Sequence, residues 1–309
     1  MKFFARVPNI NFMAQRKLGL TVSAVLTIAA ILLVVIRGLN FGIDFTGGVL
    51  VEVKYPAPVQ LEKVRADLAS AEYERAVVQY FGDSSSVLIR LPPAGKESSA
   101  QVSTHILEAL HASEAGITLR RIEFVGPQVG EELFSAGGLA LLFAFMGIAA
   151  YIMFRFEWKF SVGAIAALIH DALMVLGMLA IFQVEFDITT LAAILALIGY
   201  SNNETIVIFD RIRENLISER RLDILDVVNL SVNQTLLRSV ITHLTTLLVL
   251  SALFFLGGAT VHGFSVALIV GVIVATYSSI YVSTNLAVAL GISREDLLPA
   301  KDKEIDELP

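Results

Sequence analysis

Six long apolar stretches constrain this chain more than any other feature. They cover residues 18–36, 133–154, 160–182, 188–209, 240–256 and 263–282. At about 1.5 Å per residue, helices of these lengths span about 25 to 35 Å, which matches a hydrocarbon core of about 30 Å. Because 55% of the 309 residues are apolar, only 17% are charged and the mean hydropathy is +0.71, a water-soluble enzyme is not the expected class. The sequence predicts a polytopic α-helical membrane protein with six transmembrane helices.

The distribution of lysine and arginine predicts the orientation in the membrane. With the amino terminus inside, 14 of the 23 basic residues fall on the cytoplasmic side, in the segments 1–17, 155–159, 210–239 and 283–309. The other nine lie within 37–132, which is long enough to be exported whatever its charge. We therefore expect cytoplasmic termini, a cytoplasmic loop at 210–239 and an exported domain at 37–132. The first stretch is expected to remain as an anchor, because no small-residue cleavage pattern follows it.

Charge and cysteine content exclude several kinds of site. The net charge of −6 and the scattered basic residues give no reason to expect nucleic acid as a partner. The chain has no cysteine, which removes disulfides, thiolate catalysis and cysteine-based metal sites. No zinc-protease helix, phosphate loop or nucleophile elbow is present, so no residue is predicted to be catalytic or to bind a metal.

The exported segment alternates between the periods of strands and helices. Strands are expected at 49–55, 76–82, 86–91 and 118–125, and helices at 61–71 and 99–112. The order β-α-β-β-α-β predicts a ferredoxin-like domain in which both helices cover one face of a four-stranded antiparallel sheet. The other face is expected to receive a partner or an unfolded chain, or to pack against the protein's own membrane part.

One turn of the fourth apolar stretch is polar on every side. It reads Ser201, Asn202, Asn203, Glu204 and Thr205. Successive helical residues turn by about 100°, so these side chains point in all directions. A charge at such depth costs about 2.5 to 3.5 kcal/mol on insertion scales. We therefore expect protein, water or a partner subunit to enclose this turn.

The fifth stretch offers a cation to this acid. Arg238 opens it, Thr242 and Thr245 continue the same stripe, and His243 lies beside them. Desolvation favours a neutral carboxyl and a nearby guanidinium favours the charged form, so movement of Arg238 would load and release a proton at Glu204. The alternative is a permanent buried ion pair that holds the two helices in register.

Polar and small residues in two other stretches suggest packing. His170 and Asp171 lie in the middle of the third stretch. They are interpreted either as a relay or, preferably, as a hydrogen-bonded pair that locks adjacent helices.

The sixth stretch carries small residues every fourth position, which lets another helix approach closely. These are Ala267, Gly271, Ala275 and Ser279.

Several motifs follow one another in a specific order along the chain. They are Gly42-Ile43-Asp44-Phe45-Thr46-Gly47-Gly48, His170-Asp171, Gly199-Tyr200-Ser201-Asn202-Asn203-Glu204-Thr205, Val207-Ile208-Phe209-Asp210-Arg211-Ile212-Arg213-Glu214, Gln234-Thr235-Leu236-Leu237-Arg238 and Leu244-Thr245-Thr246-Leu247. Singly they are modest, but jointly they are very specific. Over nearly the whole chain they resemble the SecF family, the smaller subunits of SecDF protein-export complexes in the RND superfamily.

The resemblance implies an accessory motor in the bacterial inner membrane. It implies that the proton motive force, or sodium in some relatives, helps to pull exported polypeptides out after SecA has pushed them in. The implied partners are SecD, the SecYEG channel, the unfolded polypeptide and membrane lipid, with SecA and YajC less directly. The transported ion takes the place of a cofactor, and no enzymatic activity is implied.

The resemblance also implies which residues couple the ion. An intramembrane aspartate of the fourth helix and an arginine of the fifth are implicated in the family, and they fall on Glu204 and Arg238, 34 residues apart. This chain departs from the pattern, because Glu replaces Asp and Ser-Asn-Asn replaces Ser-Ile-Asn. Its carboxylate therefore reaches one methylene further. A further aspartate belongs to SecD, so half of the pathway lies outside this chain.

The motif after the first stretch lies where membrane and exported parts join. It comprises Asp44, Phe45, Thr46, Gly47 and Gly48. Motion of the exported domain would pass through the linkers 37–48 and 125–133. The two glycines permit unusual backbone angles, which suits either a hinge or a tight turn before the first strand.

Two other functions fit the same intramembrane charges. An RND-type exporter of small molecules or lipids would use them for another cargo, although such proteins usually repeat the unit that occurs once here. A scaffold that stabilises SecD would not titrate at all. Replacing Glu204 by Gln with Arg238 intact distinguishes motor from scaffold.

Overall fold

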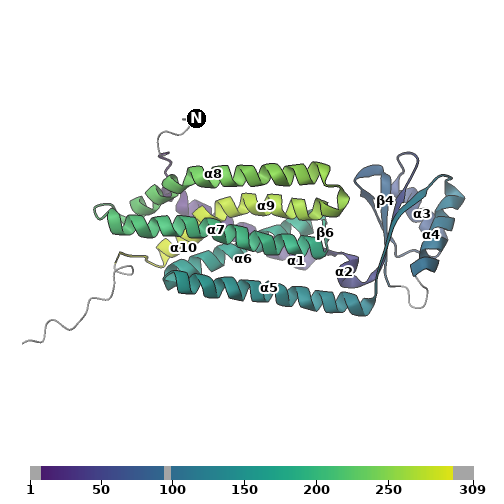
Figure 1. The fold of residues 1–309 in the computed structure, drawn as a ribbon, viewed down its shortest axis with the longest axis horizontal. Helices are drawn as coiled ribbons and strands as arrows, with labels where there is room; N and C mark the ends of the chain where they lie inside the picture. The colour runs from purple at the N-terminus through teal and green to yellow at the C-terminus, as the bar shows by residue number, and fades with distance from the viewer. Residues whose placement is uncertain (1–7, 94–98, 295–309) are drawn as a thin grey trace, which may run out of the picture.

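The computed structural model describes residues 8–93 and 99–294, and six of its helices are long and apolar enough to cross a membrane. They are α1 (Arg16–Arg37), α5 (Pro127–Arg155), α6 (Trp158–Phe182), α7 (Ile188–Ser218), α8 (Ile224–Leu256) and α9 (His262–Ser278), the last continuing through a π-helical turn, Ser279–Ser283, into α10 (Thr284–Ala289). Figure 1 shows them as a bundle with an α+β domain at one end. The predicted six-helix architecture is confirmed.

Two helices extend beyond the apolar stretches that predicted them. The segment 210–239, expected as a loop, is helical except for 219–223, because α7 ends at Ser218 and α8 begins at Ile224. Apolar residues keep a helical spacing through these ends, and Ile212, Leu216 and Val227 are fully buried there. Of the basic residues used to predict orientation, Lys2, Arg6, Lys96, Lys301 and Lys303 lie outside the described residues.

Small residues allow the helices of the bundle to approach closely. A Cβ added to Gly271 on α9 would lie 2.6 Å from Leu197 Cδ1 on α7, and one on Gly177 of α6 would lie 2.8 Å from Ala30 Cα on α1. Ala267, Ala275 and Ser279 are also buried. The stripe on α9 is therefore a packing surface, as its spacing predicted.

The α+β domain has the predicted order of elements. It consists of β2 (Gly48–Lys54), α3 (Leu61–Ser70), β3 (Val77–Phe81), β4 (Asp83–Leu91), α4 (Ser99–Ser113) and β5 (Thr118–Val125). The strands lie in the order β3-β4-β2-β5 and all pairs are antiparallel. Val51, Val53 and Ile89 alternate onto one face and pack against Leu68 of α3 and Ile106 of α4. This is the ferredoxin-like arrangement.

A short parallel ladder ties the domain to the bundle. β1 (Asn40–Phe41) pairs with β6 (Glu185–Phe186), which connects α6 to α7. A single helical turn, α2 (Ile43–Thr46), follows β1 and leads into β2. The outer turn between α6 and α7 is thus part of the domain junction.

Candidate functional site

The polar turn of α7 is enclosed by protein on all sides but one. Ser201, Asn202, Glu204 and Thr205 are buried, and Glu204 is only 8% exposed. Asn203 alone points to the outside of the bundle. This agrees with the expectation of an enclosed turn and leaves one polar side chain for lipid or a partner.

Glu204 faces a histidine. Its Oε2 lies 3.7 Å from Nε2 of His243 on α8, and both side chains are less than a tenth exposed. On its far side, Nδ1 of His243 lies 2.8 Å from Oγ1 of Thr276 on α9. Three helices, α7, α8 and α9, therefore contribute one polar group each to the same place, although the contact between Glu204 and His243 is longer than a hydrogen bond.

An aromatic residue borders these polar groups. The ring of Tyr200, one turn before Glu204, lies 5.5 Å from the ring of His243. Its hydroxyl donates to Oγ1 of Thr246 at 3.3 Å. Tyr200 thus packs beside the imidazole of His243.

Several buried polar atoms at this level have no hydrogen-bond partner among the described residues. They are Oδ1 of Asn202, Oγ1 of Thr205 and Nε2 of His243. Buried polar atoms are usually paired with protein or water, so these three atoms are places where a water molecule or an ion would complete the pairing.

Arg238 does not meet Glu204 in this structure. It is exposed, and within residues 8–93 and 99–294 its guanidinium makes no ion pair or hydrogen bond. The hydroxyl of Thr242 bonds the Arg238 carbonyl at 2.9 Å, and that of Thr245 bonds the Ile241 carbonyl at 3.0 Å. The hydroxyls of the predicted stripe therefore bond to backbone carbonyls of α8 and do not lead toward Glu204.

The phase of α8 explains this difference. His243 lies five positions after Arg238, and at about 100° per residue the two side chains point about 140° apart. When His243 faces α7, Arg238 must face away from it. Sequence spacing placed His243 only beside the stripe, and it gave no signal for Thr276 as the partner of this histidine.

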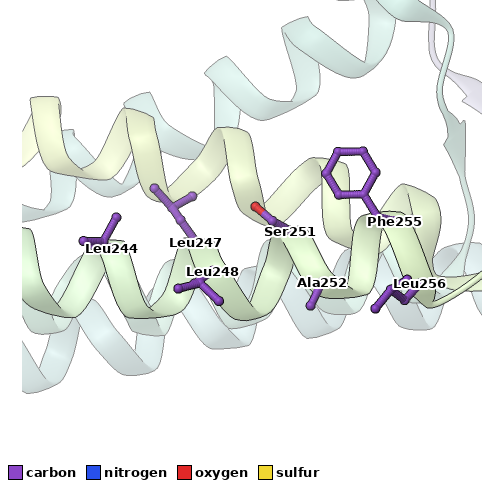
Figure 2. Close-up of a pocket in the computed structure, with 7 residues that line it drawn as sticks. All are labelled: Leu244, Leu247, Leu248, Ser251, Ala252, Phe255 and Leu256. Atoms are coloured by element: carbon purple, nitrogen blue, oxygen red, sulfur yellow. The ribbon is translucent and has the colours of Figure 1, made fainter.

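Arg238 shares its helix with an open apolar hollow. The hollow has a volume of about 540 Å³ and lies along the second half of α8, from Leu244 to Leu256. Figure 2 shows the side chains that line it. It is lined by Leu244, Leu247, Leu248, Ser251, Ala252, Phe255 and Leu256. α8 thus presents a cation and an apolar hollow to the surroundings of the bundle.

Asp171 joins three helices. Its Oδ2 accepts hydrogen bonds from Ser201 of α7 at 2.5 Å and from Ser278 at the end of α9 at 2.8 Å. Its Oδ1 lies 3.0 Å from Nδ1 of the adjacent His170. Asp171 is 1% exposed. This geometry supports the interpretation of a hydrogen-bonded lock, and the partner Ser278 was not anticipated from the sequence.

The motif after α1 forms a tight junction. Asp44 accepts a hydrogen bond from the backbone N–H of Ile188, where α7 begins. Phe45 stacks on Phe186 with ring centroids 5.5 Å apart. Thr46 donates to the backbone carbonyl of Gly42 at 3.1 Å. These contacts join the motif to the outer end of α7.

Both glycines of the motif have backbone angles that favour glycine. Gly47 has φ +69° and Gly48 has φ +131°. A Cβ on Gly47 would lie 2.9 Å from Pro127 Cα, and one on Gly48 would overlap the carbonyl oxygen of Leu91. The close packing accounts for them as a tight turn.

The second face of the sheet also packs on the bundle. Arg90 of β4 forms an ion pair with Glu185 at 2.9 Å and donates to Oδ1 of Asn40 and to the Phe41 carbonyl. Burial raises the pKa of Glu185 above its usual range, although Arg90 opposes this shift. Of the two possibilities for this face, contact with the protein's own membrane part is realised around Arg90.

Comparison with known proteins accounts for the motifs. The family described as "Protein export membrane protein SecD/SecF, C-terminal" matches residues 105–293, and "SecD/SecF GG Motif" matches residues 32–59. The protein translocase subunit SecF of Pseudomonas aeruginosa is 48% identical, covering 98% of this chain and 99% of its own. That of Haemophilus influenzae is 44% identical, covering 98% and 93%.

Solved structures agree with this relationship. The crystal structure of SecDF from Thermus thermophilus, a translocon-associated membrane protein, is 40% identical with a TM-score of 0.84. SecDF in its super-membrane-facing form gives a TM-score of 0.69 at the same identity. This chain covers 39% of each SecDF chain, and 92% of this chain is covered. The chain therefore belongs to the SecF family of protein-export membrane proteins.

Proposed function

We propose that this chain is the SecF subunit of an ion-gradient-driven machine that assists protein translocation through the Sec channel. The observation that carries the proposal is that the carboxylate of Glu204 is buried within a membrane-spanning helix and has no fixed cationic partner in the part of the chain that the structure describes. Among the described residues, no lysine or arginine lies within 4.0 Å of its carboxylate. A carboxylate held permanently by Arg238 would have favoured a static ion pair, whereas an acid without a fixed countercharge is free to bind and release an ion.

The proposed orientation follows the basic residues. Arg155, Lys159 and Arg211 lie near the ends of α5, α6 and α7 at the end of the bundle away from the α+β domain. By the positive-inside rule this end is cytoplasmic, so both termini are cytoplasmic and residues 37–132 are periplasmic. The protein is an inner-membrane protein of the Sec system in this proposal.

SecD is the proposed partner along α8. Two exposed polar side chains, Arg238 of α8 and Asn203 of α7, would be solvated poorly by lipid. Lipid could fill the apolar hollow of α8, but without specificity. A SecD helix would fill the hollow and offer Arg238 an acidic countercharge, which the family resemblance places in SecD. SecYEG, the exported polypeptide and, less directly, SecA and YajC complete the proposed assembly.

The ion gradient is the proposed energy source, without a cofactor or enzymatic step. One charge that crosses about 100 mV releases about 2.3 kcal/mol, so several ions per cycle can tilt the periplasmic domain against a bound polypeptide. The junction of β1, β6 and Arg90 would carry that motion.

Glu204→Gln tests this function in proteoliposomes that contain SecYEG, SecA, SecD and this chain. We expect the variant to lose gradient-dependent stimulation of export while SecD still co-purifies. Glu214→Gln is the matched control, because Glu214 lies on the same helix but is paired with Arg211 at the surface. Unchanged stimulation with Glu204→Gln would indicate a scaffold, and ion-coupled transport of small molecules without SecYEG would indicate an exporter.

A further inference from the structure

The contacts of His243 favour a proton on Nδ1. Oγ1 of Thr276 donates its hydrogen to the Val272 carbonyl at 2.8 Å. The same oxygen lies 2.8 Å from Nδ1 of His243, so it accepts there and Nδ1–H donates. In the neutral imidazole, Nε2 is then left with a lone pair. Nε2 is the nitrogen that lies 3.7 Å from Oε2 of Glu204.

This tautomer has a consequence for the number of protons in the pair. An ionised carboxylate and a lone pair at 3.7 Å, both buried, repel each other. One proton between Oε2 and Nε2 removes the repulsion, either as a carboxylic acid that donates to Nε2 or as an imidazolium that donates to the carboxylate. A second proton is not needed to remove this repulsion, because the other ring nitrogen, Nδ1, already carries a hydrogen that Oγ1 of Thr276 accepts.

We propose that Glu204 and His243 share one transported proton, and that His243 makes this coupling site selective for protons over sodium. The proposal rests on the proposed function and specifies its ion. Transfer moves the proton from Oε2 to Nε2. The pair then changes from a neutral acid and a neutral imidazole to a carboxylate and an imidazolium, and its net charge stays at zero. Release of the proton leaves the lone pair and the carboxylate facing each other, and the two side chains separate.

The chemistry of the pair disfavours sodium. Hard cations are bound by oxygen ligands, and here one side of the carboxylate is occupied by an imidazole nitrogen. In the protonated state the imidazolium repels a cation. The longer glutamate matters, because an aspartate at 204 would end one methylene short of His243.

Other titratable groups near the pair are engaged elsewhere or turned away. Tyr200 on α7 donates to Thr246, and Tyr277 on α9 donates to the Gly19 carbonyl at 2.7 Å. His170 and Asp171 on α6 are bonded to each other, with Ser201 and Ser278 on Asp171. Arg238 on α8 points about 140° away from His243. Glu204 is thus the charged group that His243 faces.

The test uses the reconstituted export system with a pure pH gradient and then a pure sodium gradient. We expect the native protein to respond to the pH gradient and not to the sodium gradient. In His243→Gln the side-chain amide donates to the ionised carboxylate, so the pH of half-maximal stimulation should fall by about one unit. His262→Gln, at the exposed start of α9, is the matched control and should leave the profile unchanged.

A second variant keeps the test valid if His243→Gln fails to assemble. Glu204→Asp retracts the carboxylate from Nε2 while His243 stays in place, so the pH profile of this single variant should shift away from that of the native protein. Infrared difference spectra with labelled histidine should show an imidazole signal that disappears in both Glu204→Gln and His243→Gln. Sodium-driven export, or a pH profile that His243→Gln leaves unchanged, would overturn the proposal. Retained gradient dependence in Glu204→Gln would instead refute the proposed function itself.

Discussion

The guanidinium of Arg90 lies 2.9 Å from the carboxylate of Glu185, and this pair joins the α+β domain to the outer end of the bundle. Their side chains are only 10% and 24% exposed. Arg90 also binds Asn40 and Phe41, so one residue of β4 contacts both the linker after α1 and the turn before α7. The domain is therefore held at a defined point.

Arg90→Gln should loosen this junction. Removing one partner of a largely buried ion pair leaves Glu185 uncompensated, which costs about 3 kcal/mol. We expect a lower free energy of unfolding and faster amide exchange over residues 38–48, measured by denaturation and hydrogen exchange in nanodiscs. Arg211→Gln removes an exposed pair with Glu214 and should cost less than about 1 kcal/mol. Equal losses in the two variants would contradict a special role for Arg90.

Glu185 should make stability depend on pH. Burial raises its folded-state pKa above the ordinary value of 4.5, so the folded protein binds more protons than the unfolded chain between these values. The stability that protonated Glu185 contributes is fully present below about pH 4.5 and is lost as pH rises through its folded-state pKa. Melting curves from pH 4 to pH 7 should show Glu185→Gln gaining stability relative to the native protein as pH rises. A constant difference would show that Arg90 cancels the effect of burial.

Asp171→Ala should destabilise the bundle. It removes the acceptor of Ser201 and Ser278 and the partner of His170, and intramembrane hydrogen bonds average about 0.6 kcal/mol with a maximum near 1.7. We expect a loss of about 2 kcal/mol in detergent unfolding. Asp171→Asn keeps an acceptor oxygen, so it should lose less and still support gradient-driven export. Loss of that export at unchanged stability would place Asp171 on the ion path.

Gly48→Ala should prevent correct assembly of the domain junction. Its φ of +131° is strained for alanine, and the added Cβ would overlap the Leu91 carbonyl. Gly82→Ala is the matched control, since Gly82 also has a positive φ of +83° but open space around it, and should cost about 1 kcal/mol. Yield and thermal stability of the purified variants measure the difference. Similar behaviour of the two would attribute the effect to backbone angle alone.

Elements that depend on local periodicity could be predicted from the sequence. The alternation of Val49, Val51 and Val53 gives one buried face, and the structure pairs this strand with β4 and β5. The six apolar stretches likewise predict six spans. The ends of α7 and α8 were missed because charged residues beyond the apolar core do not interrupt a helix.

Contacts between distant segments could not be predicted in the same way. Spacing placed Arg238 within reach of Glu204, but the packing of α8 against α7 and α9 turns His243 inward instead. Apolar residues surround both positions on α8, so the sequence does not indicate which side faces the bundle. Arg90 and Glu185 are 95 positions apart, and neither neighbourhood signals the other.

The pairing of β6 with β1 has a mechanical consequence for the acid of α7. β6 leads directly into α7, whose first N–H is held by Asp44, and the helix continues without interruption through Glu204. Sixteen residues of helix measure about 24 Å and do not stretch appreciably. α7 is therefore a stiff connection between the two, and we expect a tilt of the outer domain to displace the carboxylate of Glu204.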